Sequence, residues 1–166
     1  IDTLEGTSYV GGIAGSFVSG KIAYNTIIAN TIQGFDHVGG IVGENLGLTT
    51  GNINNNTVEI SDSLMGGSYV GGICPISYAP TPQEIFNNTL TINRIKGDTF
   101  VGGLVAELAY GGVNNNTLTA GTIVGAGEYV GGAVGKVGFI GCTIQSNTIN
   151  APIIQMLGGS VYTGGI

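Results

Sequence analysis

Tyr69-Val70-Gly71-Gly72-Ile73 is the stretch that decides the fold, because its pattern of ring, β-branched residue, two glycines and aliphatic residue recurs along the whole chain. The other copies, some with a substituted ring, Val or Ile, are Tyr9–Ile13, His37–Ile41, Phe100–Leu104, Tyr129–Ala133 and Tyr162–Ile166. Measured on the second glycine, successive copies are 28, 32, 31, 29 and 33 residues apart. Such a period is typical of stacked repeats joined by loops of variable length. The chain is therefore a tandem array, and its recurrent residues are expected to serve the stack.

Each repeat contains two further segments that indicate strands. One is an aliphatic residue, a spacer and glycine, as in Ile95-Lys96-Gly97, and the other follows the pattern Ile-x-x-Asn-Thr-aliphatic, as in Ile85–Ile92. Their β-branched residues, near-alternation and terminal Gly or Asn are strand signals, and helix propensity is poor throughout. We predict an all-β fold, a parallel β-solenoid (β-helix) of about five coils of 28–33 residues with three short strands per coil.

In such a solenoid each residue lies over its counterpart in the next coil, so equivalent positions form columns. Two aliphatic columns are predicted to point inward and build the core. They are Ile13, Ile41, Ile73, Leu104 and Ala133, and Ile27, Val58, Leu90, Leu118 and Ile149. The glycine pair marks either a positive φ or the close approach of another backbone, and the sequence leaves both alternatives open.

Composition narrows the class of protein. The 166 residues are expected to form one solenoid domain, 1–166, and because the chain begins in mid-repeat we expect a piece of a longer protein. The chain has 4 basic and 10 acidic residues, a net charge of −6 and no basic cluster, so nucleic acid is not an expected partner. The apolar runs are too short for this segment to insert into a membrane. No cofactor or metal is expected.

The two cysteines, Cys74 and Cys142, lie two repeats apart. Two coils would separate them by about 9–10 Å along the solenoid axis, whereas a disulfide needs Cα atoms nearer than about 7 Å. We therefore predict two free, buried thiols.

The first residue of the repeated motif is predicted to form a column of stacked rings about 4.8 Å apart. This aromatic ladder is Tyr9, His37, Tyr69, Phe100, Tyr129 and Tyr162. His37 is the only histidine, and a catalytic or metal role would need partners that the sequence does not supply, so a structural role is preferred. Asp36 beside it shares its column with Ser8, Ser68, Thr99 and Glu128, which favours an ordinary solvated position.

A second polar column is expected to form a hydrogen-bonded ladder at a corner, because Asn tolerates left-handed backbone and its amide can bond to copies above and below. This asparagine ladder is Asn25, Asn56, Asn88, Asn116 and Asn147. A calcium or sugar site is the alternative, but no calcium-binding nonapeptide and no recurrent carboxylates accompany the column.

Three Asn-Asn-Thr sequons make Asn55, Asn87 and Asn115 candidate glycosylation sites. Glycans on adjacent coils would crowd at strand spacing, and the two ladders already demand the same residues.

A threonine column beside the asparagines is expected to face outward, since it alternates with inward aliphatic residues. It contains Thr26, Thr57, Thr89, Thr117 and Thr148. A regular Thr array is what an ice-binding face of a β-solenoid looks like. However, Ile28, Glu59 and Asn150 interrupt the next file, and Thr is also a favoured strand residue.

Catalytic groups are sparse, so the chain is not expected to be an enzyme. Polysaccharide-processing β-helices need two or three carboxylates, or carboxylates with Arg or Lys, in one groove. The ten Asp and Glu residues of this chain scatter over different columns. A pairing such as Glu44 with Glu107 is the alternative left open.

A resemblance to a known family rests on Val-Gly-Gly-Ile-Val-Gly at Val38–Gly43, echoed at Val10–Gly15 and Val130–Gly135. This pattern resembles the GLUG repeat of large bacterial and archaeal cell-surface and adhesin-like proteins, which also occurs in non-catalytic regions of some IgA-specific metallopeptidases. The likeness covers essentially the whole chain. It implies a surface-exposed, non-enzymatic spacer or adhesive region with no catalytic residues to carry over.

We therefore expect a structural module of a cell-surface or secreted protein, either a rigid stalk or an adhesive region. Its expected partners are flanking repeats, other copies of the same protein, or host or surface glycans and proteins. The second hypothesis is a subunit of an extracellular filament that grows by end-to-end stacking at exposed strand edges. Ice binding and polysaccharide processing rank below these two.

Overall fold

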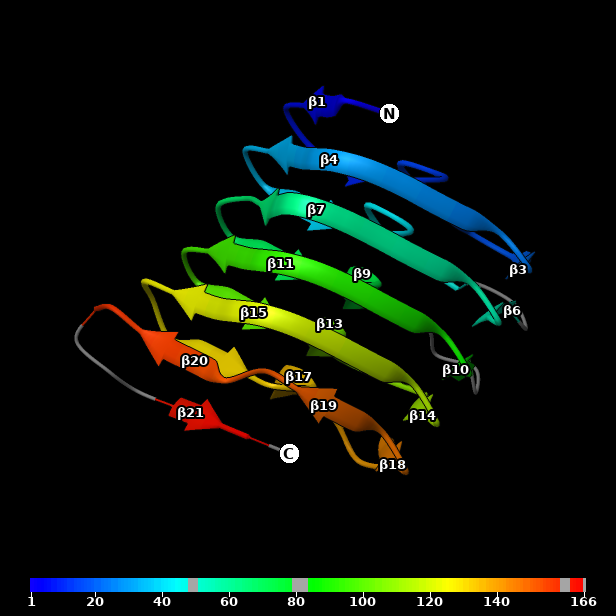
Figure 1. The fold of residues 1–166 in the computed structure, drawn as a ribbon. Helices are drawn as coiled ribbons and strands as arrows, with labels where there is room; N and C mark the ends of the chain where they lie inside the picture. The colour runs from blue at the N-terminus through cyan, green and yellow to red at the C-terminus, as the bar shows by residue number, and fades with distance from the viewer. Residues whose placement is uncertain (48–50, 79–83, 159–161, 166) are drawn as a thin grey trace.

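The computed structural model describes residues 1–47, 51–78, 84–158 and 162–165. Within these ranges the regular elements are all strands, and the strands stack in parallel as a β-solenoid of about five turns (Figure 1). The predicted fold class is confirmed. Ile166, the last residue of the sixth motif copy, lies outside the described residues.

The largest sheet carries the longest strands. At its centre lie four nine-residue strands, β4 (Thr26–Gly34), β7 (Thr57–Met65), β11 (Thr89–Gly97) and β15 (Thr117–Gly125). β1 (Thr3–Gly6) pairs with β4 at one end, and β19 (Thr148–Asn150) and β20 (Ile153–Met156) pair with β15 at the other. Figure 1 shows these strands side by side as a broad face running the length of the solenoid.

Three further parallel sheets close each coil. The glycine-pair motif supplies β2 (Val10–Gly11), β5 (His37–Gly39), β8 (Tyr69–Gly71), β12 (Phe100–Gly102), β16 (Tyr129–Gly131) and β21 (Tyr162–Gly164). The next sheet contains β9 (Cys74–Ser77), β13 (Val105–Leu108) and β17 (Val134–Val137). The last contains β3 (Gly20–Ala23), β6 (Gly51–Asn54), β10 (Glu84–Phe86), β14 (Gly112–Asn114) and β18 (Thr143–Gln145).

Like residues pair across coils. Val70 lies between Val38 and Val101 in the second sheet, and the flanking residues pair in the same register. This direct stacking of equivalent positions is the geometry from which the columns were predicted.

The division into strands differs from the prediction, because each complete central coil has four strands rather than three. The Ile-x-x-Asn-Thr segment breaks at a corner, so that β10 ends at Phe86 and β11 starts at Thr89. Asn87 makes that corner with a φ of 55°. β11 then runs on without a break through the Ile95-Lys96-Gly97 segment. The fourth strand, β13 in this coil, follows the glycine pair where the sequence predicts a loop.

The predicted inward columns form the core in the middle of the stack, where Ile41, Ile73 and Val58 are fully buried. Coverage fails at the two ends. Ile13 in the first coil is 40% exposed and Ile149 in the last is only partly buried, because a neighbouring coil covers one side only. The expectation that Ile13 is a core residue is therefore wrong for this coil.

The glycine pair is explained by close backbone approach and not by positive φ. Neither Gly39 nor Gly40 has a positive φ. A Cβ on Gly40 would collide with the carbonyl oxygen of Gly72 in the next coil, and one on Gly39 would lie 2.8 Å from the carbonyl oxygen of Ile73. A side chain at Gly40 would push adjacent coils apart, and one at Gly39 would also collide with the Val42 carbonyl of its own coil.

Candidate functional surfaces

The asparagine ladder lies along a buried corner between the sheet of β3, β6, β10, β14 and β18 and the broad sheet. Its members are Asn25, Asn56, Asn88, Asn116 and Asn147. In the first four, the side-chain Nδ2 donates to Oδ1 of the asparagine in the next coil at 2.9–3.0 Å, and the backbone N–H donates to the same oxygen at 2.9–3.1 Å. In the last four, Nδ2 also donates to a backbone carbonyl of the preceding coil at 2.7–3.0 Å. Each interior asparagine thus links three coils.

Burial and backbone conformation explain why the column is asparagine. Asn56, Asn88 and Asn116 are at most 1% exposed, so their amide groups depend on one another for hydrogen bonds. The expectation that these asparagines accommodate left-handed backbone is wrong, because the positive φ belongs to the residue before each of them.

The sequon asparagines occupy that left-handed position. The φ angles of Asn55, Asn87 and Asn115 are 53°, 55° and 54°, and Tyr24 and Ser146 adopt the same conformation in the first and last coils. Asn is one of the few residues that tolerates this conformation. Asn87 and Asn115 are exposed, whereas Asn55 is half-buried and its Nδ2 donates to Oδ1 of Asn54 at 2.8 Å. Backbone geometry accounts for these residues, and their glycosylation stays a prediction.

The aromatic ladder forms one continuous stack. Successive ring centroids from Tyr9 to Tyr162 are 4.6–5.1 Å apart. The planes of Tyr69 and Phe100 differ by only 1°, whereas the Tyr9 and His37 rings are tilted by 31°. Because each inner ring is covered on both faces by its neighbours, the stack exposes edges and not flat faces.

His37 has a polar partner that the sequence analysis discounted. Its Nδ1 lies 2.8 Å from Oδ2 of Asp36, and both side chains are half-buried. The expectation that Asp36 is an ordinary solvated residue is therefore wrong. No recurrent column could have revealed this contact, because the pair occurs in one coil only.

An ion pair lies against two inner rings of the aromatic ladder. Lys136 Nζ lies 3.0 Å from Oε1 of Glu107 and 5.2 Å and 5.6 Å from the ring centroids of Phe100 and Tyr129. The hydrogen bond to Glu107 raises the pKa of Lys136. Burial, followed by the negative charge of Glu107, raises the pKa of Tyr69. These contacts hold the exposed edge of the stack in place.

A second aromatic stack was missed by the sequence analysis. Tyr110 and Phe139 stack with centroids 4.8 Å apart, and Tyr78 meets Tyr110 edge to face at 6.1 Å. Tyr110 and Phe139 each follow the second glycine of their repeat by seven residues and Tyr78 by six, so the signal was present but blurred by loop length.

The threonine column is in register along the broad sheet, and four of its five members are exposed, with Thr57 half-buried. The next outward file runs Ile28, Glu59, Thr91 and Thr119, so its first two members are not threonines. β7 also shifts register next to this file, opposite the Ile92/Arg94 stretch of β11. These interruptions give the face a mixed surface, and ice binding stays a prediction.

The carboxylates that could have formed a pair are engaged separately. Glu44 accepts a hydrogen bond from Ser16 at 3.0 Å, and Glu107 binds Lys136. Glu107 pairs in register with Ile76, and Ile76 lies one coil after Glu44. Glu44 and Glu107 are therefore two coils apart. Among the described residues, no group of three or more His, Cys, Asp or Glu side chains is placed to hold a metal ion.

Both cysteines are free, as expected, but only Cys74 is fully buried. Burial raises the pKa of the Cys74 thiol. Cys142 is half-buried, contrary to the prediction, because it lies in the last coil; its Sγ is 3.3 Å from the Ala109 carbonyl oxygen.

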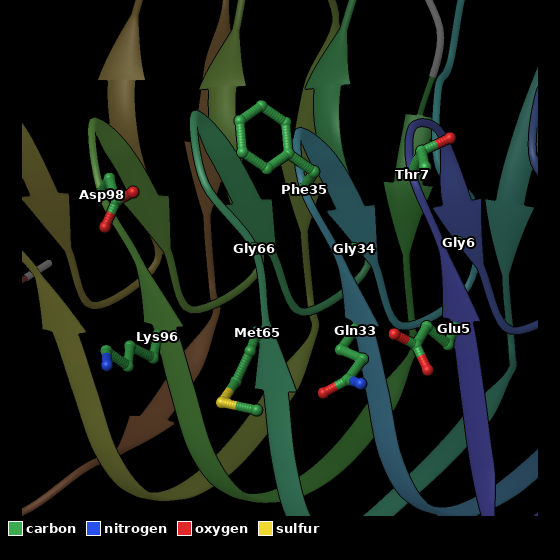
Figure 2. Close-up of a pocket in the computed structure, with 10 residues that line it drawn as sticks. All are labelled: Glu5, Gly6, Thr7, Gln33, Gly34, Phe35, Met65, Gly66, Lys96 and Asp98. Atoms are coloured by element: carbon green, nitrogen blue, oxygen red, sulfur yellow. The ribbon is translucent and has the colours of Figure 1, made fainter.

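An open groove of 440 Å³ follows the corner where the broad sheet turns into the glycine-pair sheet. Figure 2 shows two rows of side chains on either side of Gly6, Gly34 and Gly66. One row is the in-register column Glu5, Gln33, Met65 and Lys96. The other belongs to the corner loops and contains Thr7, Phe35 and Asp98. The sequence analysis identified none of these residues as a site.

Comparison with known proteins leaves the assignment to structural reasoning. No family model, no curated protein and no solved structure matches this chain. The described residues contain no helix with the length and hydropathy needed to cross a membrane. The resemblance to the GLUG repeat stays a prediction.

Proposed function

We propose that this chain is a rigid structural module, a stalk or adhesive region of a cell-surface or secreted protein. The observation that carries the proposal is that the asparagine and aromatic ladders continue through every coil without a gap. Side chains at these recurrent positions are therefore used to attach one coil to the next.

Stiffness follows from the way the ladders are placed. The asparagine ladder lies inside one corner, and the aromatic ladder lies along the glycine-pair sheet. Bending would have to open one of these columns, where each coil contributes buried hydrogen bonds or a stacked ring. In repeat proteins each unit contacts only its neighbours, so the interfaces between adjacent coils contribute directly to the stability of the whole stack. A surface location is proposed on the resemblance to the GLUG repeat.

Rigidity is testable with two spin labels on the threonine column. In a chain carrying Cys74→Ala and Cys142→Ala, Thr26→Cys and Thr148→Cys place labels four coils apart, or about 19 Å between backbones. A rigid rod predicts one narrow distance distribution, and the Thr26 and Thr117 pair, three coils apart, should give a correspondingly shorter one. A broad distribution of label distances would contradict the proposal. So would two distances whose proportions do not change with protein concentration, since these could not come from association of copies. Antibody labelling of intact source cells tests the surface location.

A filament subunit is the second candidate, because all hydrogen bonds between asparagine side chains of the ladder point in the same direction along the stack, and each end of the ladder is therefore left with an unused group. Among the described residues, Oδ1 of Asn25 accepts no hydrogen bond, whereas the backbone N–H of Asn147 lacks the side-chain acceptor that the other four have. A flanking repeat or another copy stacked head to tail would supply both missing partners. Electron microscopy at increasing protein concentration should show fibres if copies stack, and Asn25→Ala should shorten them. Monomers at all concentrations would exclude this candidate.

A further inference from the structure

We propose that the groove of Figure 2 binds a neutral, extended oligosaccharide that lies along the solenoid axis. This inference goes beyond the proposed structural role and does not depend on it. It rests on three observations: the polar groups of the groove are unused, an aromatic ring stands exposed on its rim, and its course crosses successive coils.

The polar side chains that line the groove have no partners in the part of the protein that the structure describes. In the described ranges, Glu5, Gln33, Lys96 and Asp98 make no side-chain hydrogen bond and no ion pair. The asparagine ladder, by contrast, is bonded from coil to coil, and Ser16 is bonded to Glu44 in the next coil. The groove therefore presents free donors and acceptors along its length, and Met65 is the one apolar member of the row, between Gln33 and Lys96. Successive members lie about 4.8 Å apart.

The mixture of charges favours hydroxyl groups as ligands. A hydroxyl can donate to the carboxylates of Glu5 and Asp98 and accept from the ammonium of Lys96. A polyanion would meet the two carboxylates and a polycation would meet the lysine, so either would face a like charge within the groove. A neutral sugar chain avoids both repulsions.

Phe35 supplies the apolar surface that a sugar ring needs. Its side chain is 82% exposed at the tip of a corner loop, and Figure 2 shows its ring standing beside Gly34 and Gly66. Gly67, its counterpart in the next coil, leaves an opening beside the ring that is lined by Gly66 and Asp98. A pyranose laid on this ring would remove exposed apolar surface from water.

The length of the groove sets the size of the ligand. Glu5, Gln33, Met65 and Lys96 belong to four successive coils, so the row is about 14 Å long. This is enough for a few sugar rings in extended conformation. A compact monosaccharide would contact one coil only and bind more weakly.

The test is an amide NMR titration with cellohexaose, mannohexaose and chitohexaose, with an alginate hexasaccharide as the charged comparison. We expect at least one neutral hexasaccharide to shift the amides of Gly34, Gly66 and Lys96 in a saturable way. Phe35→Ala should raise its Kd at least about tenfold. Since Phe35 is so exposed, its replacement should leave the melting temperature unchanged.

Tyr24→Asn is the matched control, because Tyr24 is 76% exposed, lies away from the groove and has a φ of 61° that Asn accepts. It should bind like the parent protein. The proposal is overturned if no neutral hexasaccharide binds, if the shifted amides lie outside the groove, if Phe35→Ala binds like the parent, or if alginate binds more tightly. None of these results would alter the spin-label distances that test the rod.

Discussion

Replacing Asn88 with alanine removes the central member of the asparagine ladder. Oδ1 of Asn88 accepts hydrogen bonds from the backbone N–H and the Nδ2 of Asn56, both at 3.0 Å. Its Nδ2 donates to Oδ1 of Asn116 and to the carbonyl oxygen of Ile53, both at 2.9 Å. Asn88→Ala therefore removes contacts with both neighbouring coils.

The loss in the free energy of unfolding follows from these contacts. The backbone N–H of Asn56, in a residue only 1% exposed, loses its acceptor, and an orphaned buried donor costs about 1–3 kcal/mol. The two bonds that Asn88 Nδ2 donates to neighbouring coils contribute about 0.5–1.5 kcal/mol each. We expect Asn88→Ala to lower the free energy of unfolding by about 2–6 kcal/mol.

Asn25→Ala is the matched control, since Asn25 has the same place in the repeat but lies exposed in the first coil. Its side chain donates to Asn56 and to the Ala23 carbonyl but accepts no bond among the described residues, and water can replace the lost partners. We expect a cost of about 1 kcal/mol or less.

Urea unfolding of the two variants and the parent protein measures the difference, provided that the slopes with denaturant agree. Hydrogen exchange adds a local readout, because the Asn56 amide should lose protection in Asn88→Ala and keep it in Asn25→Ala. Equal destabilisation by the two substitutions would refute the view that the ladder holds the coils together.

Three further outcomes are expected. Gly40→Ala should destabilise strongly, because its Cβ would meet backbone of the next coil, whereas Gly165→Ala, with no atom within 4 Å of its Cβ, should be nearly neutral in thermal melts. Burial, then nearby carboxylates, raises the pKa of Tyr69 above 10.0, so its stabilising contribution is complete below about pH 10 and is lost as the pH rises through the folded-state pKa; unfolding titrations should show a smaller alkaline loss in Tyr69→Phe. Burial raises the pKa of the Cys74 thiol, so a thiol reagent should modify Cys142 in the folded protein and Cys74 only after unfolding, and rapid modification of both would contradict the buried position.

Recurrence made the fold predictable from the sequence. Because parallel coils place like residue over like, the pattern at Tyr69–Ile73 gave both the period and the columns, and Val38, Val70 and Val101 stack accordingly. The number of strands per coil was harder to predict. The corner at Asn87 is a single left-handed residue. Because the buried residue that follows, Asn88, is also asparagine, the residue type does not show which of the two turns the chain.

Contacts that do not recur from coil to coil were beyond a method based on repetition. The Asp36–His37 contact joins neighbours within one coil, and the Lys136–Glu107 ion pair joins one column position of two adjacent coils, but both columns contain unrelated side chains elsewhere. The groove is a further case, because it forms where two sheets meet. Sequence periodicity says which residues share a column, but not how far apart two columns lie across a corner.

The variable columns of a repeating scaffold are where a ligand can be accommodated. At the asparagine ladder every coil has the same residue because each side chain must match the one above it. At the groove the paired positions hold Glu5, Gln33, Met65 and Lys96, four different chemical types at one register. Stacking between coils does not require such a series, since none of these side chains bonds to its neighbour in the described part of the chain. The scaffold thus leaves the residues of this column free to vary, so that they can be chosen for contacts with a ligand and not for contacts with the next coil.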